Sequence, residues 1–291
     1  MLLTDRHASE RGWALVSVLW GLVIISLIAA VMLSSARVSY RQAVYSVEQA
    51  QRQARAEAAT ARAVLGLLDT REDHRWRVDG VAQAWVFDGQ EVQVAIQDEG
   101  GKIDLNAAGE PAIRQLLGVI GPAPVGMADK ILDWRDQHGE LHRLNGATSK
   151  TYSEAGRDYV PRGGPYQSID ELKLTLDMTS ALYERLKPAV TVYSGRSKVN
   201  PTTAPKEVLM ALLGQNDATA SAAIAARNGS VLVGQTQGQP IIGGRIAMGI
   251  PIEGWTFSVR VRQPKQGNEQ DRVIRISSKT AQRFDCLDVT E

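Results

Sequence analysis

The sequence has little of what covalent cross-links and catalytic sites are usually built from. Its single cysteine, Cys286, cannot form a disulfide within the chain. No nucleophile elbow or phosphate-binding loop is present, and no histidine lies near Cys286 in the sequence to activate it. Nucleophilic catalysis therefore has no support, and we expect no enzymatic activity.

An excess of charge of one sign is also missing. The 33 lysines and arginines nearly balance the 32 aspartates and glutamates. The chain therefore lacks the strongly basic character that nucleic-acid-binding domains usually show. Its 291 residues are enough for about one or two folded domains.

The clearest positive feature is an apolar run of 24 residues without a charge, from 13 to 36. As a helix the run is about 36 Å long, which crosses a hydrocarbon core of about 30 Å with some tilt. A cleaved signal peptide is the alternative, because Ser34 and Ala36 form a tolerable cleavage site. Signal peptides, however, usually have an apolar region of only about 7–15 residues. We therefore expect a retained membrane anchor.

The helical pattern continues beyond the apolar run. Residues 37–68 contain no proline and one glycine, and apolar residues recur there every three or four positions. One face of this predicted helix carries small side chains that allow close approach of a partner helix. These residues are Val47, Ala50, Ala54, Ala58 and Ala61.

The rest of the chain predicts strands on either side of a helical middle. Residues 84–87 and 91–96 alternate in polarity around Asp88-Gly89, a strong hairpin signal, and residues 255–262 and 272–276 alternate again. Residues 102–118 recur in similar form at 198–214. Each copy predicts a capped helix that stops at a glycine, Gly118 or Gly214.

Acidic residues near glycines in the middle of the chain suggest a calcium site, because calcium prefers oxygen ligands. The candidates are Asp133, Asp136, Glu154 and Asp158. The alternative is a polar loop closed by ordinary salt bridges, since the spacing is not that of an EF-hand. The nearby His138 and His142 do not have the spacing of a zinc motif, and we interpret them as part of a solvated loop.

Residues 116–135 resemble a helix-hairpin-helix, in which backbone amides grip a DNA phosphate. Residues 166–172 are similar to a phrase in membrane-anchored competence DNA receptors. Against this, the stretch from Lys102 to Lys198 has 13 basic and 12 acidic residues, whereas DNA affinity rests largely on neutralising phosphates. A DNA-binding protein of competence-receptor type is the alternative function, and we expect no nucleic-acid partner.

The start of the chain resembles a type IV prepilin leader. Arg11-Gly12-Trp13 stands ahead of the apolar helix, and the resemblance implies that a membrane peptidase cuts between Gly12 and Trp13. The fifth mature residue would be Ser17, where pilins carry a glutamate. An intramembrane carboxylate is costly unless paired, and pilins pair it with the α-amino group of the neighbour already in the fibre. Ser17 therefore fits a subunit placed first, and equally an anchor that never polymerises.

Nearly the whole chain resembles one family, the K subunit or minor pseudopilin K of the type II secretion system. The resemblance rests on the leader, on Ser17, and on four further phrases. These are 98–106 (DEGGKIDLN), 131–135 (ILDWR), 161–172 (PRGGPYQSIDEL) and 191–195 (TVYSG) leading into 199–201.

The family fold is α+β, with a long N-terminal membrane-spanning helix and a pseudopilin-type antiparallel β-sheet that carries a large inserted α-helical domain. The implied organisation is a leader (1–12), the transmembrane half (13–36) and periplasmic half (37–70) of the N-terminal helix, a first β part (71–105), the inserted helical domain (106–195), and a second helical repeat with the second β part (196–291).

The resemblance also implies a place in the cell and a set of partners. It implies a single-pass protein of the inner membrane with most of its chain in the periplasm, at the tip of the pseudopilus. The implied partners are the I-type and J-type minor pseudopilins, the prepilin peptidase and the inner-membrane assembly platform. Family members bind calcium in the helical domain. This chain has Gly-Ala-Thr-Ser at 146–149, where the family tends to have an acidic Gly-Ala-Glu-Asp, which predicts weakened or lost calcium binding.

Overall fold

The computed structural model describes residues 7–69, 71, 74–136, 143–229, 241–242, 245–246, 252–263, 268–277 and 284–290. The chain divides into two compact units, Met1–Glu57 and Ala58–Glu291. The predictions for residues 1–6 and for the loop with His138 and His142 lie outside the described residues.

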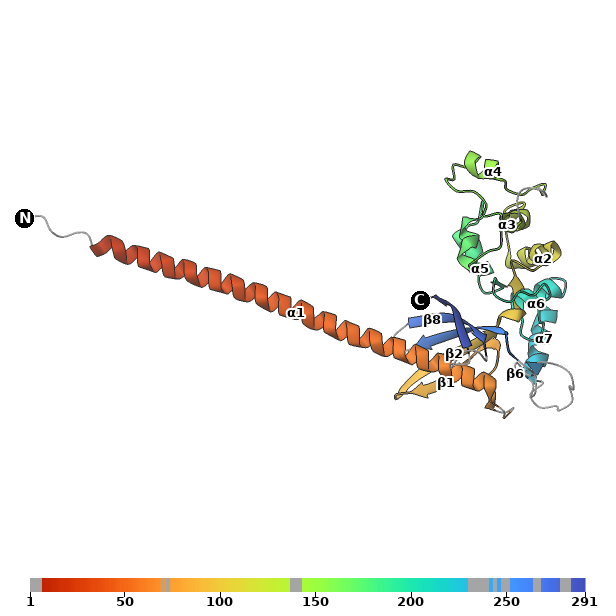
Figure 1. The fold of residues 1–291 in the computed structure, drawn as a ribbon, viewed down its shortest axis with the longest axis horizontal. Helices are drawn as coiled ribbons and strands as arrows, with labels where there is room; N and C mark the ends of the chain where they lie inside the picture. The colour runs from red at the N-terminus through yellow and green to blue at the C-terminus, as the bar shows by residue number, and fades with distance from the viewer. Residues whose placement is uncertain are drawn as a thin grey trace, which may run out of the picture. The chain divides into compact units, whose positions relative to one another are not determined.

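Helix α1 (His7–Leu68) makes up the described part of the first unit and continues into the second (Figure 1). It confirms the prediction of an apolar helix that runs on without a break into an amphipathic one. Alanine, glutamine, arginine and glutamate favour a helix over its second half, and no proline interrupts it. Its most apolar stretch has a mean hydropathy of 2.7, and the helix is long enough to cross a membrane.

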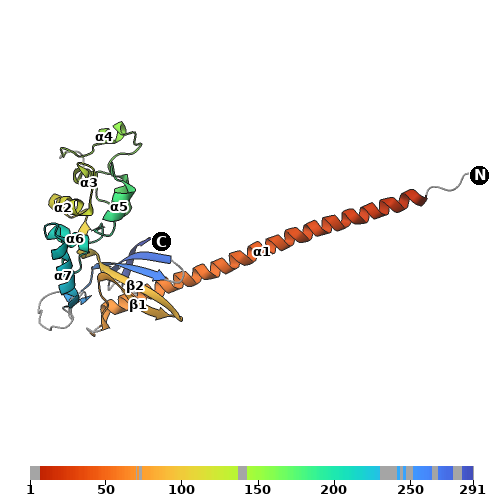
Figure 2. The same cartoon turned by 180° about the vertical axis from the view of Figure 1, so that it is seen from behind.

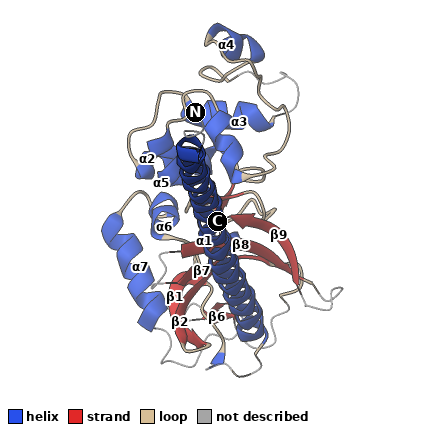
Figure 3. Cartoon of the chain, turned by 90° about the vertical axis from the view of Figure 1, so that its left-hand side faces the viewer, coloured by secondary structure: helices blue, strands red, loops and turns tan. Residues whose placement is uncertain are grey.

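Five described strands form one antiparallel sheet in the order β1-β2-β7-β8-β9. Figure 2 labels β1 and β2 at one end of this order. The strands are β1 (Asp79–Phe87), β2 (Gln90–Asp98), β7 (Thr256–Gln263), β8 (Asn268–Ile276) and β9 (Phe284–Thr290). The β1–β2 turn is the predicted hairpin, because Asp88 and Gly89 both have positive φ, 51° and 66°. The last turns of α1 lie across the sheet (Figure 3). Ala59, Ala63 and Leu67 in these turns are buried.

Helices occupy the chain between β2 and β7. They are η2 (Glu99–Gly101), α2 (Glu110–Ile120), α3 (Met127–Arg135), α4 (Ser149–Glu154), η3 (Ile169–Leu174), α5 (Ser180–Leu186), α6 (Lys206–Leu212) and α7 (Asp217–Gly229). Short strands accompany them: β3 (Ile103–Asp104) pairs in parallel with β4 (Val190–Thr191), and β5 (Ile241–Ile242) pairs with β6 (Arg245–Ile246). The predicted α+β class is therefore confirmed.

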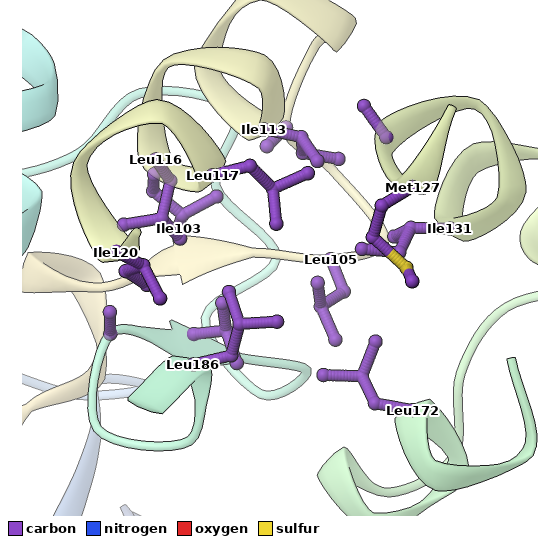
Figure 4. Packing of buried hydrophobic residues seen from close by; sticks show 14 of the residues in the cluster. Ile103, Leu105, Ile113, Leu116, Leu117, Ile120, Met127, Ile131, Leu172 and Leu186 are labelled. Carbon is purple, nitrogen blue, oxygen red and sulfur yellow. The ribbon is translucent and has the colours of Figure 1, made fainter. Parts of the chain in front are cut away.

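The helical domain has its own hydrophobic core (Figure 4). Helix α2 contributes one apolar face at the predicted helical spacing, with Ile113, Leu116, Leu117 and Ile120 all buried. The core residues from the other elements include Ile103, Leu105, Met127, Ile131, Leu172 and Leu186.

The repeat predicted from the sequence is a repeat in structure. In the first copy, Asp104 Oδ1 accepts hydrogen bonds from the amides of Asn106 (2.8 Å) and Ala107 (3.1 Å) ahead of α2. In the second, Asn200 Oδ1 accepts one from the amide of Thr202 (3.2 Å) ahead of α6. Both helices begin at the same position of the repeat.

The two glycines of the repeat behave differently. Gly214 has φ 75° and follows the end of α6, as predicted for a glycine stop. Gly118 lies inside α2, which continues to Ile120, so the predicted stop at Gly118 is wrong. Gly118 instead makes room for Gln215, whose Nε2 would lie 2.4 Å from a Cβ at position 118.

Candidate assembly interface

The predicted cleavage residues, Gly12 and Trp13, lie within α1, and the Trp13 side chain is 80% exposed. Four residues further on, the Ser17 hydroxyl donates a hydrogen bond to the carbonyl of Ala14 at 2.9 Å. The polar group at this position is therefore satisfied within its own helix, whereas an ionised carboxylate in a membrane needs a partner. Cleavage itself stays a prediction.

The predicted partner-helix face of α1 is open. Val47 is 56% exposed, Ala50, Ala54 and Ala61 are also exposed, and Ala58 is half-buried. We call these five residues the alanine stripe. By the helical period the stripe lies opposite the alanines at 59 and 63, which are fully buried. The sequence alone did not reveal this division, because alanine occurs on both faces of the helix.

Asp98, the first residue of the DEGGKIDLN phrase, ties the end of β2 to the second copy of the repeat. Its carboxylate accepts hydrogen bonds from the Gly100 amide (2.9 Å), Asn200 Nδ2 (3.2 Å) and Thr203 Oγ1 (3.0 Å). The residue is 1% exposed. Burial raises the pKa of the Asp98 carboxyl above its usual range, and these hydrogen bonds offset only part of the shift.

Other residues of the same phrases complete this junction. Asp104 Oδ2 accepts hydrogen bonds from Ser194 Oγ and from the Gly195 amide, both at 2.8 Å, which joins DEGGKIDLN to TVYSG. The buried Glu99 contacts Lys102 Nζ and Ser258 Oγ, both at 2.7 Å, so it connects the phrase to β7 of the sheet. The phrase at 98–106 therefore joins the helical domain and the second copy of the repeat to the sheet.

The structure does not bring together all four residues predicted to bind calcium. Asp133 and Asp136 both bind the guanidinium of Arg143, at 2.6 and 2.7 Å. Glu154 forms an exposed pair with Lys150 at 3.7 Å, and Asp158 is exposed. Among the described residues, no group of three or more acidic, histidine or cysteine side chains is arranged to hold a metal ion.

The turn between α2 and α3, predicted to resemble a helix-hairpin-helix, borders a cavity of about 350 Å³. The first turn of α3 contains the buried Asp129, whose carboxylate pairs with Arg114. A carboxylate at the start of a helix repels a phosphate that would bind there. The two basic residues of α3 are also engaged, Lys130 with Asp177 and Arg135 with the carbonyl of Leu105. The absence of a nucleic-acid partner stays a prediction.

Comparison with known proteins finds similarity to one family. Residues 92–195, from β2 through the helical domain to Gly195, match the family model described as type II secretion system (T2SS), protein K. The type II secretion system protein K of Pseudomonas aeruginosa is 26% identical over 227 residues, covering 70% of this chain and 68% of the relative. That of Klebsiella pneumoniae is 26% identical over 230 residues and covers 70% of each chain.

The resemblance to the type II secretion K family is confirmed. A solved structure also shares the fold: a chain of the GspK-GspI-GspJ complex from enterotoxigenic Escherichia coli. It matches with a TM-score of 0.52 at 15% identity, over 84% of this chain and 97% of that chain. The fold of this chain, with its long helix, antiparallel sheet and additional helices, therefore matches the fold of the solved chain.

Proposed function

We propose that this chain is a minor pseudopilin at the tip of the type II secretion pseudopilus, where it initiates or caps assembly with I-type and J-type minor pseudopilins. The fibre would serve protein export across the outer membrane. The observation that carries the proposal is the exposed alanine stripe on α1, a surface suited to a second helix. The similar solved chain, from a complex with GspI and GspJ, supports partners of this kind.

The end position is supported by Ser17. A subunit that adds beneath another pilin presents a carboxylate to the α-amino group of its neighbour, whereas the Ser17 hydroxyl bonds within its own helix. The helices between β2 and β7 add a further argument, because a bulky insertion leaves little room for lateral neighbours in a fibre. Both features suit a single copy at one end.

The place of the protein in the cell follows from the same helix. Helix α1 is apolar and long enough to anchor the chain once in the inner membrane. We place the sheet and the helical domain in the periplasm, where the other minor pseudopilins would meet the stripe. The prepilin peptidase would act on Gly12 and Trp13 at the cytoplasmic face, and the inner-membrane assembly platform would receive the processed chain.

A charge placed on the stripe tests the proposal. Full-length chain carrying Ala54→Arg is co-expressed with the I-type and J-type pseudopilins, extracted in detergent and analysed by affinity capture and native mass spectrometry. We expect wild type to form a complex with one copy of this chain, and Ala54→Arg to recover at least about tenfold less partner, because an arginine prevents close helix packing.

The matched control is Gln49→Arg, which adds the same charge to an exposed position on the other side of α1. Gln49→Arg should leave partner recovery unchanged. Long homopolymers of this chain, or equal loss with both variants, would contradict the tip assignment.

A further inference from the structure

A charge cluster in the described part of the helical domain centres on Arg143. Its Nη1 lies 2.6 Å from Asp133 Oδ1, its Nη2 lies 2.7 Å from Asp136 Oδ2, and its Nε lies 3.9 Å from Glu110 Oε2. The Arg143 side chain is only 20% exposed and that of Asp133 only 8%. Carboxylates from α2, from α3 and from the end of α3 therefore surround one guanidinium.

Neighbouring arginines extend this cluster. Arg114 pairs with Glu110 at 2.7 Å and also with Asp129, while Arg135 lies 3.5 Å from Asp136. Within the described residues, the network thus alternates four carboxylates with three guanidinium groups. Little negative charge is left over to attract a divalent cation.

Asp133 is committed on both of its oxygens. Oδ1 binds Arg143, and Oδ2 accepts a hydrogen bond from the Ala147 amide at 3.1 Å. Gly146 fits closely against the same carboxylate, because a Cβ there would lie 1.6 Å from Oδ2. Asp133 therefore holds the chain that follows Arg143 to the end of α3.

These residues do not fit a calcium ion. Calcium takes six to eight oxygen ligands, and here a guanidinium already stands between Asp133 and Asp136. The side chain of Thr148 is also engaged within the chain, because it forms a capping box with Thr151 at the start of α4. A calcium ion beside Arg143 would meet a positive charge where it needs oxygen.

We propose that the Arg143 guanidinium is an internal cation that takes the structural role of a bound calcium ion at the end of α3. A planar guanidinium donates to two carboxylates at once in fixed directions, so it can join the end of α3 to the chain after residue 142. Because this cation is part of the chain, the helical domain keeps its structure without metal.

Thermal unfolding of the full-length chain in detergent, followed by tryptophan fluorescence, tests the proposal. Each sample is measured with a chelator, with calcium at about 1 mM, the range of extracellular calcium modules, and with magnesium at the same concentration. We expect the Tm of wild type to differ by less than about 1 °C among these conditions, because the Arg143 cluster offers the ion no open site.

Arg143→Gln removes the internal cation and leaves the carboxylates. We expect its Tm in chelator to fall by several degrees, and calcium, though not magnesium, to restore at least about 3 °C of the loss. Arg143→Lys, which keeps a positive charge, should lose less and stay insensitive to calcium. Arg157→Gln, at an exposed position of the same domain, is the matched control and should change nothing.

The following outcomes overturn the proposal. If calcium, but not magnesium, raises the Tm of wild type in a saturable way, the ion still binds to the unaltered chain. An Arg143→Gln variant that folds but does not respond to calcium shows that the guanidinium is not in the place of a metal. If Arg143→Gln does not fold, Asp133→Asn decides. Its Tm loss should be equal with and without calcium, and a loss confined to the calcium sample overturns the proposal.

Discussion

Asp98 illustrates how a single residue connects distant parts of this chain. Its donors belong to residues 100, 200 and 203, so one carboxylate joins the end of β2 to the turn that precedes α6. Three converging donors satisfy the oxygens of the carboxylate, but they bring no formal positive charge into direct contact with it. Its burial is therefore only partly compensated, and desolvation raises the pKa of Asp98.

The raised pKa of Asp98 predicts a pH dependence of stability. A carboxyl that binds its proton more tightly in the folded state stabilises the fold at low pH, and this contribution is lost as pH rises through the raised pKa. Asparagine at this position has no such proton. We therefore expect the unfolding free energy of wild type, relative to Asp98→Asn, to decrease between about pH 4 and pH 7.

Urea unfolding of the full-length proteins across this pH range measures the difference. The same substitution at Asp88, exposed in the β1–β2 turn, serves as the control. A difference between wild type and Asp98→Asn that grows with pH would contradict the predicted direction.

At the scale of elements, two glycines that look alike in the sequence have different neighbours in the structure. A Cβ at Gly101 would lie 2.7 Å from the backbone oxygen of Thr203 and from its side-chain hydroxyl, the group that also binds Asp98. A Cβ at Gly118 would meet only the end of the flexible Gln215 side chain. The first neighbour cannot move without disturbing the junction, whereas the second can.

Alanine substitution at these two glycines should therefore have unequal effects. We expect Gly101→Ala to lower the unfolding free energy by about 2 kcal/mol, because the backbone of residue 203 must shift. We expect Gly118→Ala to change it by less than about 1 kcal/mol, since the better helix propensity of alanine offsets the displacement of Gln215. Chemical unfolding of the full-length variants measures both, and equal losses would contradict this interpretation.

Local signals explain which elements were predictable from the sequence. The long helix follows from composition and period, and the β1–β2 hairpin follows from Asp88-Gly89, because these patterns act within a few residues. Gly118 was misread as a helix stop, because the reason for that glycine is a side chain 97 positions later, at Gln215. The acidic residues near 133 were recognised, but their partner, Arg143, lies ten positions after Asp133, and no local pattern pairs the two.

At the scale of the whole molecule, the two ends of α1 have different roles. Its last turns bury one face against the sheet, while the alanine stripe on the opposite face stays open. Its first half is apolar and unburied, and Ser17 lies there with its hydroxyl bonded inside the helix. If the apolar half of α1 anchors the chain in the membrane, as we propose, that anchor does not use the surface that we assign to partners.

Processing at the start of α1 determines whether this helix can join an assembly. Gly12 lies within the helix, and a peptidase must draw the backbone out of its helical hydrogen bonds to cut after it. Glycine makes this step easier, because it weakens the helix by about 1 kcal/mol relative to alanine and carries no side chain to block close approach.

We therefore expect intact mass spectrometry of the membrane-extracted protein, co-expressed with a prepilin peptidase, to give Trp13 as the first residue. Gly12→Val should leave the leader attached in most of the protein, whereas Gly21→Val, whose added Cβ has no neighbour within 4 Å, should be cut normally. An N-terminus between Ser35 and Val38, in wild type or in Gly12→Val, would indicate signal-peptide cleavage and remove the membrane anchor on which the pseudopilin assignment depends.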